Sequence, residues 1–220
     1  MSTPELTRKS NGAKEEPNTV RRKATAVSIA IASIGELLVE FVCSDKGGRH
    51  KRLGTYAGPY PSGAPGIFID QAARCGGRAI FVGAVGQDAF GEVILERLRA
   101  DGVDDSLIAI HPDLPTGTAF VSYNADGSRD FVYNIVHSAA AQFAADEAVE
   151  PLLAFGTALI HVSGSALSNE AMGGKVLRLC KALHARGVEI SLPAAMSFPC
   201  ARGLMGHEAL HLRRSWKPRR

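Results

Sequence analysis

The residues best suited to chemistry lie in two bends of residues 61–91 that are poor in side chains. Gly63 in the first bend lacks a Cβ atom, so the main chain there can approach a ligand closely. In the second bend Asp88 stands where a helix N-cap belongs, which favours a structural role over that of a catalytic base. Two such bends at one sheet edge would present backbone groups to a small polar ligand. The expected structural residues of the second bend are Gly83, Gly86, Asp88 and Gly91.

Alternating strands and helices must position these bends. A strand-like run covers residues 27–43 and is broken at Gly35, and its Glu36 and Glu40 suit a site at a strand end. Residues 79–85 form a short apolar run that is typical of a strand buried on both faces. The alternation predicts a mainly parallel α/β sheet between helices. Helices are expected at residues 62–75, 88–100, 146–155 and 168–186, and further strands at 158–162 and 188–192.

Residues 107–136 interrupt this alternation. Strand-like segments at 107–111, 117–123 and 129–136 follow one another, and Asp126-Gly127 is a strong hairpin signal. We therefore predict a small antiparallel β lid, with its hairpin at about residues 117–136.

Charge and cysteine content exclude several classes of protein. The chain has 220 residues and a net charge of +3, but residues 27–192 carry 13 basic and 18 acidic residues, so the basic excess belongs to the two ends. This distribution argues against nucleic-acid binding. The four cysteines contain no C-x-x-C pair and favour reduced thiols and a cytoplasmic protein.

The ends of the chain differ from its body. Residues 1–26 have few large apolar side chains and are predicted to be a disordered leader. The basic cluster at 21–23 before an apolar run imitates a signal peptide, but we favour a buried first strand. No run of about 20 uninterrupted apolar residues predicts a membrane span.

The two bends also carry a resemblance to the ribokinase-like (PfkB-type) carbohydrate kinases. Residues 83–91, GAVGQDAFG, match a family G-x-V-G-x-D-x-F-G segment in full. The first bend departs from the family pattern, because Ser62 replaces a usual glycine and Ile67 a usual Asn. The segments GPYPSGAP, HPDLPTG and DGSRDFVYNIVHSA are similar to a subgroup near the tagatose and 2-keto-3-deoxygluconate kinases.

This resemblance implies phosphoryl transfer from ATP with Mg²⁺ to a hydroxyl of a sugar or sugar acid. It places Glu40 on the sugar hydroxyls, since a carboxylate can accept two hydrogen bonds at once. It puts further contacts on the lid, whose closure would exclude water. The substrate-binding residues that it implies are Glu40, Ser62, Gly63, Phe120 and Asn134.

The catalytic half of such a kinase is not found in this sequence. The family uses a late Gly-Ala-Gly-Asp segment as anion hole and base, and neither it nor a Walker A motif occurs here. Where the family continues with Asp-x-Asn-x-Arg, residues 193–197 read PAAMS. We therefore expect truncation or a frameshift after Leu192, a missing C-terminal nucleotide-binding part, weak ATP binding and no catalytic residue.

Residues 193–220 are expected to be an aberrant, disordered basic tail after the incomplete kinase domain of residues 27–192. Their HEALH segment matches the H-E-x-x-H zinc motif, but no third ligand follows it, so we expect no metal site. Two alternatives to a kinase remain open: a non-catalytic module that binds sugar or forms a homodimer through the lid, and a chain that does not fold stably.

Overall fold

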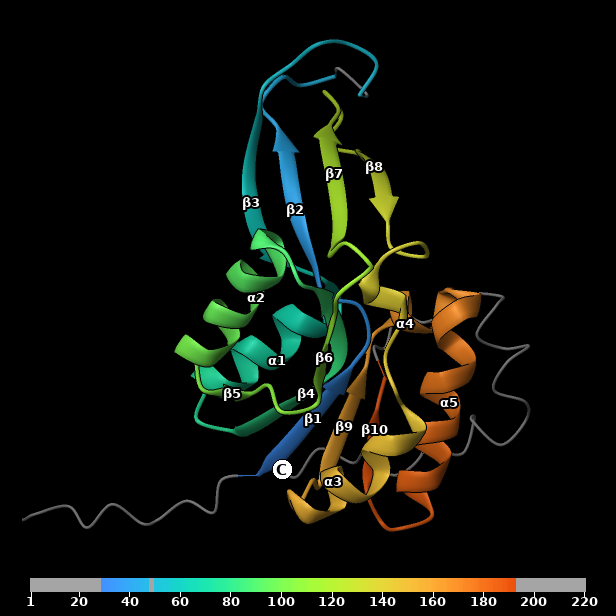
Figure 1. Cartoon of the computed structure of the whole chain (residues 1–220). Helices are drawn as coiled ribbons and strands as arrows, with labels where there is room; N and C mark the ends of the chain where they lie inside the picture. The colour runs from blue at the N-terminus through green and yellow to red at the C-terminus, as the bar shows by residue number, and fades with distance from the viewer. Residues whose placement is uncertain (1–28, 48–49, 193–220) are drawn as a thin grey trace, which may run out of the picture.

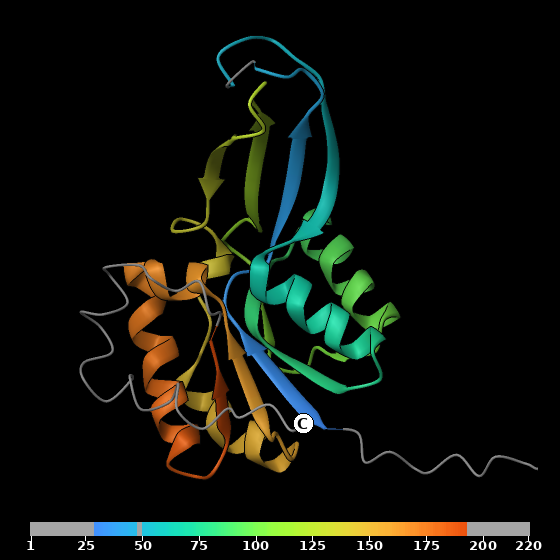
Figure 2. The same cartoon turned by 180° about the vertical axis from the view of Figure 1, so that it is seen from behind.

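A main parallel sheet flanked by helices carries a second, smaller sheet at one end (Figures 1 and 2). The computed structural model describes residues 29–47 and 50–192. The expected leader at 1–26 and the expected tail at 193–220 lie outside these residues, so both stay expectations.

The main sheet is entirely parallel, as the alternation predicts. Its strands run in the order β10-β9-β1-β4-β5. Strand β6 pairs with residues 83–86 of β4, further along that strand than residues 79–80, which pair with β5. A parallel sheet covered on both faces is built from apolar runs, and β4 is such a run. The strands are β1 (Ala30–Ile34), β4 (Arg78–Gly86), β5 (Val103–Asp104), β6 (Ile108–His111), β9 (Leu159–Val162) and β10 (Glu189–Ser191).

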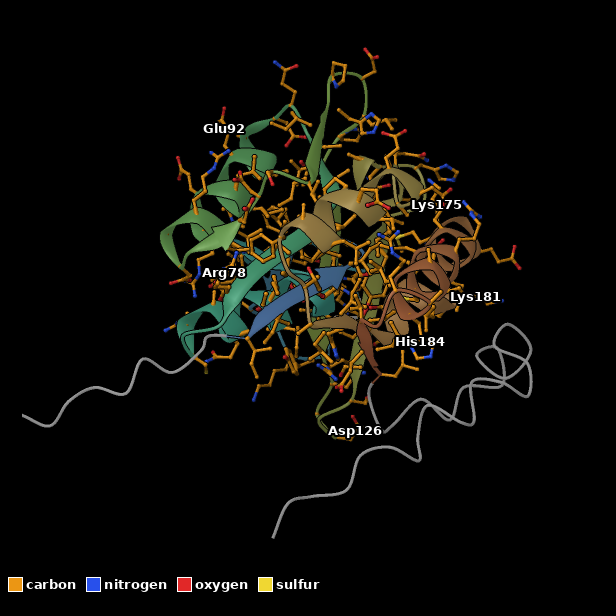
Figure 3. The ribbon with its side chains drawn as sticks, turned by 90° about the horizontal axis from the view of Figure 1, so that it is seen from below. Arg78, Glu92, Asp126, Lys175, Lys181 and His184 are labelled. Carbon is orange, nitrogen blue, oxygen red and sulfur yellow. The ribbon has the colours of Figure 1, made fainter. Side chains whose placement is uncertain are left out.

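Two apolar clusters hold the helices to opposite faces of this sheet. Successive side chains of β4 alternate between them: Phe81 packs with Ile69 and Ile94 of helices α1 and α2, and Val82 with the cluster around helix α5. Charged side chains such as Glu92 and Lys181 point outward (Figure 3). The helices are α1 (Ala64–Arg74), α2 (Ala89–Ala100), α3 (Val149–Ala154), α4 (Gly164–Ser168) and α5 (Glu170–His184), with 3-10 turns η1 (Ala139–Ala141) and η2 (Asp146–Ala148).

The smaller sheet, called the lid sheet below, has the order β3-β2-β7-β8. Strands β2 and β7 are parallel while the two outer pairs are antiparallel, so the lid hairpin at 117–136 is antiparallel, as predicted, but the lid sheet as a whole is mixed. The hairpin predicted at Asp126-Gly127 joins β7 to β8 and is confirmed. The strands are β2 (Leu38–Cys43), β3 (Tyr56–Ser62), β7 (Gly117–Tyr123) and β8 (Arg129–Asn134).

Three further boundaries differ from the sequence prediction. Strand β3 was not predicted because its two prolines are strand breakers, but it is an edge strand, where proline is tolerated. Residues 107–111 were assigned to the lid, whereas β6 pairs with β4 in the main sheet. The helix expected at 168–186 is α5, which begins at Glu170, and the short helix α4 before it was not predicted.

Asp88 ties the second bend to the lid sheet. Its carboxylate accepts hydrogen bonds from the Gly91 N–H at 2.9 Å, the Thr116 N–H at 2.8 Å and the Thr116 hydroxyl at 2.7 Å. The Thr116 oxygen in turn accepts from the Gly86 N–H at 2.9 Å. Asp88 is therefore the N-cap of α2 and also fixes Thr116, the last residue before β7.

These hydrogen bonds control the ionisation of Asp88. Burial opposes its charged form, but the hydrogen bonds from Thr116 and the N-terminus of α2 outweigh burial and lower the pKa of the carboxyl below 3.8. A lowered pKa stabilises the fold above the ordinary pKa, and this contribution is lost as the pH falls through the lowered value.

We predict that Asp88→Ala lowers the free energy of unfolding by about 1–3 kcal/mol at pH 7, because a helix cap is lost and Thr116 loses its acceptor. Urea denaturation measures the change, and Asp113→Ala at an exposed position between β6 and β7 is the control. The difference in the free energy of unfolding between wild type and D88A should become smaller below about pH 4. A difference that is constant with pH would contradict this assignment.

Candidate functional site

Several bends gather where the lid sheet meets the carboxyl ends of the main strands. The chain leaves β1 through Gly35 and Glu36 to enter the lid sheet, and returns from β3 through Gly63 into α1. Helix α4 starts directly after β9, the neighbour of β1. In parallel sheets this edge is where ligands bind.

Gly63 makes a close backbone contact at this edge. It is the N-cap residue of α1, with φ of 101°, and its carbonyl accepts the first helical hydrogen bond from Ile67 N–H at 2.9 Å. A Cβ atom at Gly63 would lie 2.5 Å from the carbonyl oxygen of Glu36. Both the backbone angle and the space therefore require glycine.

Glu40 and Ser62 meet on one face of the lid sheet. The Ser62 hydroxyl lies 3.5 Å from Glu40 Oε2, to which it donates a long hydrogen bond. The strand register places Ala119 of β7 beside Glu40, and Tyr133 of β8 beside Ala119. Because side chains alternate between sheet faces, Tyr133 shares the face of Glu40.

The pKa of the Tyr133 phenol depends on the charged groups near this face. Partial burial raises its pKa first, Glu40 and, more weakly, Glu36 raise it further, and Arg129 opposes them. Tyr133 therefore stays protonated at neutral pH and can both donate and accept a hydrogen bond. Tyr133 was not among the residues predicted from the sequence, because its place on the Glu40 face follows from the pairing of β8 with β7.

Phe120 and Asn134 do not join this group. Phe120 pairs with Phe41 and stacks on its ring, with centroids 5.2 Å apart, and Phe41 also meets Phe90 of α2 at 5.5 Å. Asn134 pairs with Thr118, on the same face as Phe120. Of the five residues predicted to bind substrate, Glu40, Ser62 and Gly63 therefore lie together, whereas Phe120 and Asn134 lie on the other face of the lid sheet.

Glu36 is a buried carboxyl at the same edge. The residue is 3% exposed, its Oε1 accepts a hydrogen bond from the Ser165 hydroxyl, and its buried Oε2 has no hydrogen-bond partner among the described residues. Burial raises its pKa above 4.5, and hydrogen bonds from Ser165 and the backbone N–H groups of Glu36 and Ala64 only partly offset this effect. Sequence analysis placed Glu36 at a strand end without a role.

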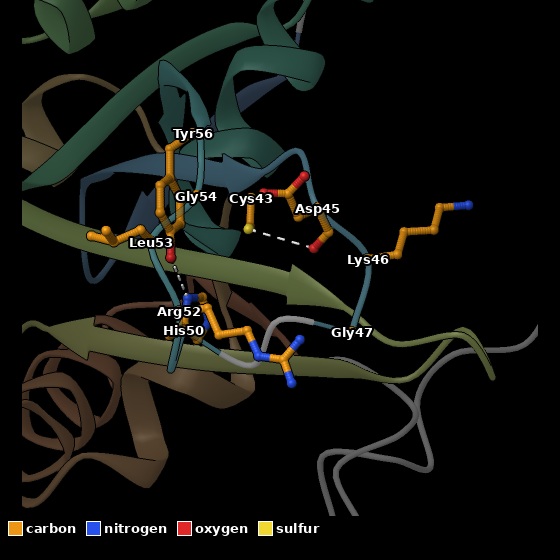
Figure 4. A pocket seen from close by; sticks show the side chains of 9 residues that line it. All are labelled: Cys43, Asp45, Lys46, Gly47, His50, Arg52, Leu53, Gly54 and Tyr56. Carbon is orange, nitrogen blue, oxygen red and sulfur yellow. Dashed lines mark hydrogen bonds between the residues drawn. The ribbon is translucent and has the colours of Figure 1, made fainter.

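Two cavities lie away from this group. One of about 240 Å³ occupies the far end of the lid sheet, where the Tyr56 hydroxyl and His50 Nδ1 are 3.0 Å apart (Figure 4). The other, of about 250 Å³, lies between the start of α2 and the lid sheet and is lined by Asp88, Phe90 and Asn134.

Within residues 29–47 and 50–192, no three His, Cys, Asp or Glu side chains are grouped as metal ligands. In the same part of the chain no helix has the length and apolar character needed to cross a membrane.

The chain is similar in sequence to known carbohydrate kinases. Residues 29–205 match the pfkB family carbohydrate kinase profile. Fructokinase-1 of Zea mays is 32% identical over 164 residues, which are 74% of this chain and 48% of the relative. Probable fructokinase-2 of Arabidopsis thaliana is 30% identical over 164 residues, or 74% of this chain and 47% of the relative. The chain thus spans about half the length of the curated relatives it matches.

Solved structures show the same fold. A putative ribokinase II from E. coli in its apo form superposes with a TM-score of 0.69 and 39% identity, covering 74% of this chain and 52% of that one. A fructokinase from Halothermothrix orenii superposes with a TM-score of 0.66 at 18% identity, covering 74% of this chain and 56% of that one, and supports the fold alone. The fold is therefore ribokinase-like, as the sequence predicted.

The close contact at Gly63 leads to a stability prediction. Gly63→Ala should cost about 1–2 kcal/mol for a side chain at positive φ, and about 1–3 kcal/mol more for the overlap with Glu36. Gly76→Ala is the matched control, because Gly76 has φ of 91° but no atom within 4 Å of its would-be Cβ. Thermal or urea unfolding compares the two variants, and equal losses would show that the contact with Glu36 is unimportant.

Proposed function

The chain belongs to the pfkB family of carbohydrate kinases, and on that premise we propose that the face formed by Glu40, Ser62 and Gly63 binds a sugar for phosphorylation by ATP. The contact between Ser62 and Glu40 beside the Gly63 bend is the observation that carries this proposal. The activity of a whole kinase is part of the proposal, since the chain spans about half of its curated relatives.

The chemistry of these groups suits a polyol. A carboxylate such as Glu40 accepts hydrogen bonds from two neighbouring hydroxyls, and such charge-assisted bonds are stronger than neutral ones. Ser62 and Tyr133 can each donate and accept, which suits hydroxyl groups that do the same. The bare backbone at Gly63 lets a sugar ring come close to the start of α1. The lid sheet would then exclude water from the reacting hydroxyl.

The choice of sugar rests on the relatives. The curated relatives described above are fructokinases, which favours a ketohexose such as fructose. The sequence resemblance to tagatose and 2-keto-3-deoxygluconate kinases keeps a second ketose and a sugar acid in the test panel. Glu40 favours the neutral ketoses, because a substrate carboxylate beside it would be repelled.

ATP and Mg²⁺ are proposed as cofactors by analogy. One structure similar to this chain is titled as a putative ribokinase II in complex with ATP and Mg²⁺, with 39% identity and a TM-score of 0.68. Within residues 29–47 and 50–192 no group of metal ligands occurs, and the sequence contains no Gly-Ala-Gly-Asp segment. We therefore assign no residue of this chain to ATP and propose sugar binding with little turnover.

A homodimer through the lid sheet is a second proposal. Val132 and Tyr133 lie on opposite faces of the edge strand β8, and each is more than half exposed. Because such side chains on an edge strand can pair with a second copy, the lid sheet is the surface that we propose for self-association. A cytoplasmic location is also proposed, in keeping with the unpaired thiols of Cys43, Cys75 and Cys180.

Fructose binding tests the proposed site. Glu40→Ala should raise the dissociation constant for fructose at least about tenfold, because charge-assisted hydrogen bonds are worth about 1.5–3 kcal/mol each. Isothermal titration calorimetry measures the constant, and Glu92→Ala on the exposed side of α2 is the matched control. Equal affinity of E40A and wild type would rule out Glu40 as a sugar ligand.

Turnover tests the second half of the proposal. A coupled assay of ATP consumption with fructose, tagatose and 2-keto-3-deoxygluconate should detect little activity from the 220-residue protein, since the family base motif is missing. Robust turnover would show that another residue acts as the base and would contradict this expectation.

A further inference from the structure

Glu36 lies at the point where the chain passes from the main sheet into the lid sheet. We propose that Glu36 is a positioning residue of the sugar site, whose carboxyl group locks the Gly63 bend against the start of α4. This inference rests on the proposed sugar site, but it concerns a residue that does not itself belong to the proposed sugar contacts. Three sets of contacts support it.

The first set joins Glu36 to α4. The Ser165 hydroxyl lies 2.5 Å from Glu36 Oε1, and the Ser163 and Ser165 hydroxyls are 2.9 Å apart. Ser163 is also the N-cap of α4, accepting from the Ala166 N–H at 3.2 Å. Since α4 follows β9, the carboxyl links the ends of two neighbouring strands of the main sheet.

The second set joins the same segment to α1. The Glu36 carbonyl oxygen fills the space beside Gly63, and the Ala64 N–H lies near enough to the carboxyl to lower its pKa. The preceding Gly35 packs between the two helices: a Cβ there would lie 2.8 Å from Pro65 Cγ and 3.0 Å from Ala166 Cβ. Residues 35 and 36 are therefore held between the first turns of α1 and α4.

The third observation concerns the burial of the Glu36 carboxyl group. Oε2 is buried without a partner in the described part of the chain, and burial of a carboxyl favours its neutral form. The charge of Glu36 is also felt by the Tyr133 phenol, whose pKa it raises more weakly than Glu40 does. A negative charge on this enclosed carboxyl is poorly solvated, so burial raises the pKa of Glu36.

Two variants separate a positioning role from a role in stability alone. Glu36→Gln keeps a donor and an acceptor of the same shape as the neutral carboxyl, while Glu36→Ala removes both. Ser165→Ala removes only the link to α4, and Glu92→Ala is again the exposed control. The dissociation constant for fructose is measured by calorimetry at neutral pH, with the melting temperature recorded beside it.

We expect E36Q to bind fructose within about twofold of wild type, E36A to bind at least about tenfold more weakly, and S165A to fall between them. Recovery of affinity in E36Q is the sign of a positioning role, because the amide keeps the shape of the carboxyl and an acceptor for Ser165. If E36A does not fold, S165A still decides the question, because it removes the link to α4 and keeps the carboxyl.

Wild-type affinity in E36A or in S165A would overturn the inference while leaving the proposed sugar site intact. A wild-type protein that binds none of fructose, tagatose and 2-keto-3-deoxygluconate would overturn the proposed function together with this inference. The two failures are therefore distinguishable within one set of titrations.

Discussion

The close approach of two backbone segments, Glu36 and Gly63, is the constraint on which the site depends. One segment leads into the lid sheet and the other leads out of it, and no side chain can fit between them at Gly63. This contact fixes where β2 and β3 begin and end relative to α1, and so decides that Ser62 faces Glu40. On the other side of the lid sheet, Asp88 and Thr116 fix the start of β7 in a similar way.

The two glutamates at this edge differ in environment, and the difference suggests a division of labour. Glu40 is half-buried on an open sheet face and is available to a ligand, whereas Glu36 is enclosed between two helix starts. A carboxyl in water is ionised and hydrogen-bonds hydroxyls well, while an enclosed one tends to keep its proton. The same residue type thus serves as a proposed ligand at one position and a proposed support at the other.

Local patterns in the sequence predicted most of the main sheet. The buried run of β4, the N-cap at Asp88 and the hairpin at Asp126-Gly127 are each set by neighbouring residues, and all three appear in the structure. The pairing of strands in the lid sheet was not predictable in this way, because the parallel pair of β2 and β7 joins residues about eighty positions apart. The faces of Phe120 and Asn134 follow from that register. The contact between Glu36 and Ser165 spans 129 positions and leaves no local pattern.

A crystal structure of the chain soaked with fructose tests the central claim most directly. The account predicts a sugar with hydroxyl oxygens within about 3.2 Å of the Glu40 carboxylate, close to the main chain at Gly63. Fructose bound instead in the cavity beside Asn134, or at the far end of the lid sheet, would contradict it.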